Sequence, residues 1–142
     1  MIYDFINDIC DILDIPIPSV SFDTFNFSTD TMMAQCNSDG TTIFIKKFDK
    51  PNPDQLFSIA HELRHIWQIE NYHDLFFSNY QTVDIIGTEK YNLQLAEVDA
   101  NAFASIIMVD FFHLQPQYHG LSNSVVFAIK KRIDEITIEL SE

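Results

Sequence analysis

The sequence predicts an α+β fold in a single domain, residues 1–142. Apolar residues recur at helical spacing over most of the chain, whereas a short region within residues 20–46 alternates with a period of two. Hydrophobic residues make up 46% of the chain and only 3 residues are Gly, which is a globular composition. We therefore expect a small antiparallel sheet packed on one central helix, with further helices around them.

The first element should be an amphipathic helix over residues 2–13. Its polar face carries several acids, and Pro16 shortly afterwards is expected to end it. We assign this helix a packing role, because its apolar residues form one stripe: Ile2, Phe5, Ile6, Ile9 and Leu13.

Three short strands are expected next, over residues 20–24, 31–36 and 42–46. The turn-forming residues Asn37-Ser38-Asp39-Gly40 separate the last two, so an antiparallel hairpin or small sheet should precede the central helix. An edge strand there could hold an extended peptide by main-chain pairing, or the sheet could simply cover the helix.

The central helix has a clear start. Asn52 is a cap residue, Pro53 suits the first helical position, and Gln55 follows three residues after the cap. This helix should run to about residue 70 or 71. Beyond it we expect an irregular stretch with a short helix near residues 74–79.

Two more helices complete the expected fold. One should run without interruption from Glu89 to about Leu114, since neither Gly nor Pro breaks the pattern there. The last should begin at a cap residue, Ser122 or Asn123, and end near Leu140, with an apolar stripe for core packing.

The central helix carries the motif His61-Glu62-x-x-His65. Residues four apart share one face of a helix, so both imidazoles can point at one metal ion, and neutral imidazole suits Zn²⁺. Glu62 directly follows the first histidine, which puts its carboxylate beside the water rather than on the metal, where a general base belongs. The motif is the known signature of zinc metallopeptidases. A surface helix with two satisfied histidines is the alternative, but this helix is mostly apolar.

A catalytic zinc needs a third protein ligand. The extended metzincin motif requires Gly and His where this chain has Gln68 and Asn71, so that class is excluded. The other source is an acid on a second helix. Glu97 lies among alanines, and Asn101 four residues later could hydrogen bond a ligand histidine.

Two other acids remain as weaker candidates for the third ligand. Asp99 lies about 200° around the helix from Glu97, and Glu89 is weaker still. The residue that stabilises the oxyanion stays open, and its candidates are Arg64, Tyr72, His73, Tyr80, Tyr91, His113 and His119.

Several segments together resemble the ImmA/IrrE-type metallopeptidases, which are small gluzincin-like zinc peptidases of bacteria, phages and mobile elements. They are residues 39–40, 43–45, 57–65 and 97–104, and the resemblance runs from about Asp39 to Met108. It implies a zincin-like domain with zinc on His61, His65 and Glu97, Glu62 as base, and a protein substrate such as a repressor. The chain departs from the family at Arg64, where a small residue is usual, and at Val109-Asp110, where Met-Pro is common.

The expected reaction is hydrolysis of peptide bonds. Zinc lowers the pKa of its water toward ~7 and polarises the scissile carbonyl, while Glu62 accepts the water proton and passes it to the leaving amine.

Charge and cysteine content limit the other functions. With 8 Lys and Arg against 21 Asp and Glu, the formal charge of −13 opposes nucleic-acid binding. No apolar run approaches membrane-spanning length, and Cys10 and Cys36 are expected as free thiols in the cytoplasm. The alternative function is a non-catalytic acidic interaction or inhibitor protein on the same fold.

Overall fold

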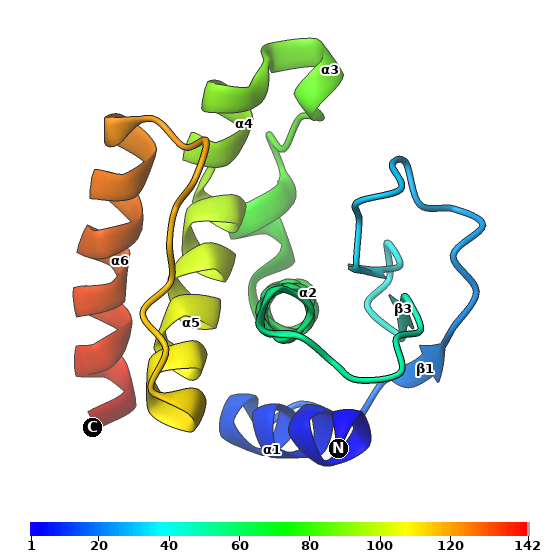
Figure 1. Cartoon of the computed structure of the whole chain (residues 1–142). Coiled ribbons are helices and arrows are strands. Elements are labelled where there is room, and N and C mark those ends of the chain that lie inside the picture. Colours follow the sequence, from blue (N-terminus) through cyan, green and yellow to red (C-terminus); the bar gives the residue numbers. More distant parts are fainter. Residues whose placement is uncertain (142) are drawn as a thin grey trace. The chain divides into compact units, whose positions relative to one another are not determined.

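The computed structural model describes residues 1–141 and confirms the α+β class, with a small three-stranded sheet and helices on both sides of it in sequence (Figure 1). The chain divides into two compact units, and the boundary lies between Tyr72 and His73. We call the N-terminal part unit 1 and the C-terminal part unit 2.

Unit 1 opens with α1 (Ile2–Leu13), which has the predicted bounds and buries the predicted apolar face from Phe5 onward. The helix ends at Leu13, before it reaches Pro16. Asp14 adopts a left-handed conformation with φ of 54°, and the N–H of Ile15 donates back to the Cys10 carbonyl. A left-handed residue after the last turn closes a helix in this way.

The sheet of unit 1 contains β1 (Ser19–Ser21), β2 (Ala34–Cys36) and β3 (Thr42–Ile45), with β3 in the middle. β2 and β3 form the predicted antiparallel hairpin, but β1 pairs with β3 in parallel, so the prediction of a wholly antiparallel sheet is wrong. The chain reverses direction twice between β1 and β3, which leaves these two strands pointing the same way. The sheet is therefore mixed.

The hairpin turn packs against the central helix. Gly40 has φ of +73°, and a Cβ built on it would lie 3.4 Å from the Ile69 side chain. Asp39 accepts hydrogen bonds from the hydroxyl and the N–H of Thr41, and these bonds lower the pKa of Asp39. A glycine fits here because the conformation is left-handed and the helix is close.

The central helix is α2 (Pro53–Phe77). Asn52 caps it as predicted, because its side-chain oxygen accepts a 2.9 Å hydrogen bond from the Gln55 N–H. Regular geometry is interrupted at Tyr72, whose φ of −144° and ψ of 44° are not helical. The regular part thus ends where the sequence predicts, and the last turn belongs to unit 2.

Unit 2 continues with α3 (Val83–Ile86), α4 (Thr88–Leu93), α5 (Leu95–Phe112) and α6 (Asn123–Ser141). The predicted single helix over residues 89–114 is wrong, because Gln94 is extended and separates α4 from α5. Both ends of the Gln94 amide bond the main chain of Gln81, at 2.7 and 2.9 Å. This distant pairing stabilises a break that no local breaker residue indicates.

α5 and α6 lie side by side and run in the same direction (Figure 1). When two neighbouring helices run in the same direction, the chain between them must return along the full length of the first helix. The 18 residues of α5 span about 27 Å, and residues 113–122 can cover about 33 Å when extended. α6 begins as predicted, since the Ser122 hydroxyl accepts from the Val125 N–H.

Within the described residues 1–141, no helix combines the length and apolar character needed to cross a membrane.

Candidate metal centre

Three side chains of α2 converge in unit 1. The rings of His61 and His65 are perpendicular, with centroids 4.6 Å apart. Oε2 of Glu62 lies 3.7 Å from Nε2 of His61 and 3.9 Å from Nε2 of His65. Both histidines therefore direct the same ring nitrogen toward one carboxylate oxygen.

Gln68 fixes the orientation of His65. Its side-chain oxygen lies 2.8 Å from Nδ1 of His65, and Gln68 is fully buried. An amide oxygen only accepts, so Nδ1 carries the proton and the lone pair is on Nε2. This is the tautomer that a metal ligand needs. This role of Gln68 was not predicted from the sequence, although the i, i+3 spacing on a helix could have indicated it.

The other oxygen of Glu62 is held by the sheet. Oε1 accepts a 2.9 Å hydrogen bond from the main-chain N–H of Cys36 on β2. In the hairpin, Asn37 bonds Thr42 and Met33 bonds Lys46 across the ladder. Alternate residues of an antiparallel strand point their main-chain groups outward. Cys36 is one of these outward residues, so its N–H leaves the ladder at the sheet edge and meets Glu62.

Arg64, the departure from the family pattern, is turned toward Trp67. Its guanidinium lies 3.7 Å from the centre of the Trp67 ring, and the residue is 3% exposed. A guanidinium stacked on an aromatic face is a favourable arrangement for a buried cation. Arg64 thus stacks on Trp67.

Glu97 lies in the first turn of α5 in unit 2 and is 3% exposed. Its Oε2 is 2.8 Å from the Tyr80 hydroxyl, which is itself 2.8 Å from the Tyr91 hydroxyl. Burial first, and then the charge of Glu97, raise the pKa of Tyr80 above its ordinary value. Tyr80 therefore keeps its proton and donates it to the carboxylate.

The two weaker ligand candidates have different surroundings. Asp99 is fully buried, and Oδ1 accepts a 2.8 Å charged hydrogen bond from Nε of Arg132 on α6. Burial alone would lower the pKa of Arg132, but Asp99, Glu139 and Glu135 raise it above the ordinary value. Glu89 is exposed on α4. Asp99 on α5 thus pairs with Arg132 on α6.

The three histidines that were candidates for stabilising the oxyanion lie at the surface or at a helix end. His73 is 59% exposed and lies 3.5 Å from Asp74, His119 bonds the exposed Gln117, and His113 is the left-handed residue that ends α5.

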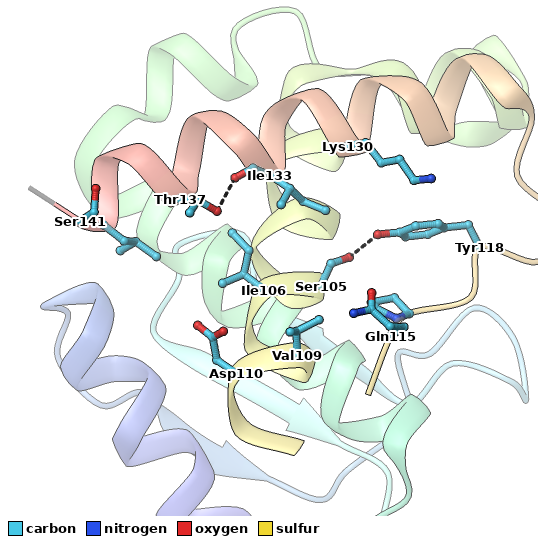
Figure 2. Close-up of a pocket in the computed structure, with 12 residues that line it drawn as sticks. Ser105, Ile106, Val109, Asp110, Gln115, Tyr118, Lys130, Ile133, Thr137 and Ser141 are labelled. Carbon is cyan, nitrogen blue, oxygen red and sulfur yellow. Dashed lines mark hydrogen bonds between the residues drawn. The ribbon is translucent and has the colours of Figure 1, made fainter. Parts of the chain in front are cut away.

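A cavity of about 610 Å³ lies within unit 2 between α5, α6 and the segment that connects them (Figure 2). Its wall includes the hydrogen-bonded hydroxyls of Ser105 and Tyr118, 2.8 Å apart. None of the residues predicted for the metal site lines this cavity.

The donor set fits zinc. His61, His65 and Glu97 each offer one ligand atom, a ring nitrogen or a carboxylate oxygen, and two histidines with one glutamate form a known kind of catalytic zinc site. The tautomer of His65 agrees with that role. No family model, curated protein or solved structure matches the chain.

Proposed function

We propose that this chain is a zinc-dependent metallopeptidase with a zincin-like fold of the ImmA/IrrE type. His61 and His65 of unit 1 and Glu97 of unit 2 would hold the metal, and Glu62 would act as the general base. The observation that carries the proposal is the convergence of both Nε2 atoms on one oxygen of Glu62, at 3.7 and 3.9 Å.

Each residue has a separate task. A zinc ion bound there supplies Lewis acidity, which makes water a stronger nucleophile at neutral pH. Glu62 would take a proton from the attacking water through Oε2 and deliver it to the leaving amine. The Cys36 N–H holds Oε1 of Glu62, so the carboxylate keeps one orientation during the transfer. Gln68 keeps the proton of His65 on Nδ1.

The edge of the sheet suits a peptide substrate. β2 is an edge strand, and its outward residues Ala34 and Cys36 alternate with residues bonded to β3. Because the Cys36 N–H already bonds Glu62, an extended peptide would add to this edge by main-chain hydrogen bonds at Ala34. The formal charge of −13 favours a protein or peptide substrate over nucleic acid, and a cytoplasmic location agrees with two free thiols.

The test uses the full-length chain. After zinc loading and dialysis, elemental analysis should find about one zinc per chain. The same sample should cleave members of an unstructured peptide library, with cleavage sites read by mass spectrometry, and a chelator should stop the cleavage. Absence of bound zinc would overturn the metal site. Bound zinc without cleavage would instead favour the acidic interaction protein that keeps its metal for stability.

A further inference from the structure

Three oxygen atoms in unit 2 form a short series that ends at Glu97. The Tyr91 hydroxyl on α4 lies 2.8 Å from the Tyr80 hydroxyl, and the latter lies 2.8 Å from Oε2 of Glu97 on α5. The three residues come from three separate segments of the chain. Their alignment is therefore a tertiary feature and not a by-product of helical spacing.

Proton counting shows which bond Tyr80 makes when Glu97 is ionised. The Tyr80 hydroxyl is placed as a donor to both Tyr91 and Glu97, but a phenol hydroxyl has only one proton to give. A charged acceptor forms the stronger hydrogen bond, so the proton of Tyr80 belongs to the Glu97 carboxylate. The Tyr91 hydroxyl is then a polar neighbour that keeps the Tyr80 hydroxyl in place.

Ring contacts hold Tyr80 and Tyr91 in place. The Tyr80 and Tyr91 rings meet at 68° with centroids 5.9 Å apart, and Phe77 packs on Tyr80 at 5.2 Å. Aromatic pairs at such separations are favourable. The hydroxyl that meets Glu97 is thus positioned before any ligand arrives.

We propose that Tyr80, supported by Tyr91, is a positioning residue that holds the Glu97 carboxylate in one orientation for the metal. This inference rests on the proposed zinc site. It also assigns Tyr80 a task other than oxyanion stabilisation, because its single proton is already given to Glu97. Loss of the hydroxyl should therefore lower metal affinity and change the ligand geometry around the ion.

The experiment compares three tyrosine variants of the full-length chain. Tyr80→Phe removes the hydroxyl that bonds Glu97 and keeps the ring. Tyr91→Phe removes the neighbouring hydroxyl. Tyr118→Phe is the matched control, since its hydroxyl bonds Ser105 instead. Zinc affinity is measured by chelator competition, and Co²⁺ spectra report the geometry of the ligands. We expect a loss of about 10–100-fold in zinc affinity for Tyr80→Phe, a smaller loss for Tyr91→Phe, and none for Tyr118→Phe.

The possible failures can be told apart. If the wild-type chain binds neither zinc nor Co²⁺, the proposed function fails. If the wild type binds zinc and Glu97→Gln weakens that binding, but Tyr80→Phe matches the wild type in affinity and Co²⁺ spectrum, the positioning role alone is overturned. Should Tyr80→Phe not fold, Tyr91→Phe decides, and wild-type affinity in that variant overturns the inference.

Discussion

The main-chain N–H of Cys36 donates a 2.9 Å hydrogen bond to Oε1 of Glu62 and so joins the edge of the sheet to the central helix. The contact spans 26 positions in the sequence. It leaves Oε2 of Glu62 facing the two histidine Nε2 atoms. One oxygen thus fixes the carboxylate, and the other is available for proton transfer in the proposed reaction.

Glu62→Gln should separate chemistry from metal binding and folding. The amide oxygen can still accept from Cys36, so the fold and the zinc content should be kept. An amide cannot take a proton at neutral pH, and loss of a general base typically costs about 10²–10⁴-fold in rate. Cleavage of the peptide library measures the loss. Glu70→Gln is the control, because it makes the same change at an exposed position of the same helix. Equal rates for Glu62→Gln and the wild type would exclude Glu62 as the base.

His61→Ala and His65→Ala should each abolish zinc retention after dialysis, because a three-ligand site that loses an imidazole keeps too few donors. His73→Ala, at a histidine whose side chain is 59% exposed, should keep about one zinc per chain. Elemental analysis of the three purified variants checks this. Zinc retained by either of the first two would mean that the ion binds elsewhere.

The features that the sequence predicts well depend on neighbours a few residues apart. The start of α2 follows from the Asn52 side chain and the main chain of Gln55, and the bounds of α1 follow from its apolar stripe. The approach of His61 and His65 follows in the same way, since the helical repeat places both rings on one face of α2.

The features that the sequence does not predict depend on contacts with residues far along the chain. The break between α4 and α5 needs Gln81 to pair with Gln94, and the parallel direction of β1 depends on which edge of β3 it joins. The bonds that orient Glu62 and Glu97 likewise come from Cys36 and Tyr80. Sequence spacing contains no signal for such contacts.

Arg132→Ala should destabilise unit 2 by about 3 kcal/mol, because it removes the charged partner of a fully buried carboxylate, Asp99. Asp99→Ala should cost less, since Arg132 then still has its two partially exposed acidic partners on α6. Lys131→Ala, at the exposed neighbouring position, should stay within about 0.5 kcal/mol of the wild type. Urea unfolding followed by circular dichroism gives the three values. An Arg132→Ala variant as stable as Lys131→Ala would refute the importance of the pair.

Cys10 should make stability fall at high pH. Burial on α1 raises the pKa of its thiol from 9.0 to about 11. Between these values the unfolded chain has lost the proton while the folded chain keeps it, so the free energy of unfolding decreases as pH rises, by up to about 3 kcal/mol. Cys10→Ala lacks this thiol and should show a shallower decline. Urea unfolding of both proteins with a reductant at pH 8, 9 and 10 tests the difference. Parallel pH profiles would show that the thiol does not contribute.

Glu97→Ala should weaken zinc binding and reduce the stabilisation that zinc provides. A ligand at about 100 times its dissociation constant stabilises the folded state by about 2.7 kcal/mol, which corresponds to a rise of several degrees in Tm for a chain of this size. The variant should show a smaller rise at the same zinc concentration. Glu89→Ala removes an exposed acid on α4 and should respond to zinc like the wild type.

Asp99→Ala should lower Tm with and without zinc but keep the zinc-dependent rise, because its carboxylate pairs with Arg132. If Asp99→Ala releases the metal while Glu97→Ala retains it, the third ligand is Asp99, and the resemblance over α5 must be realigned.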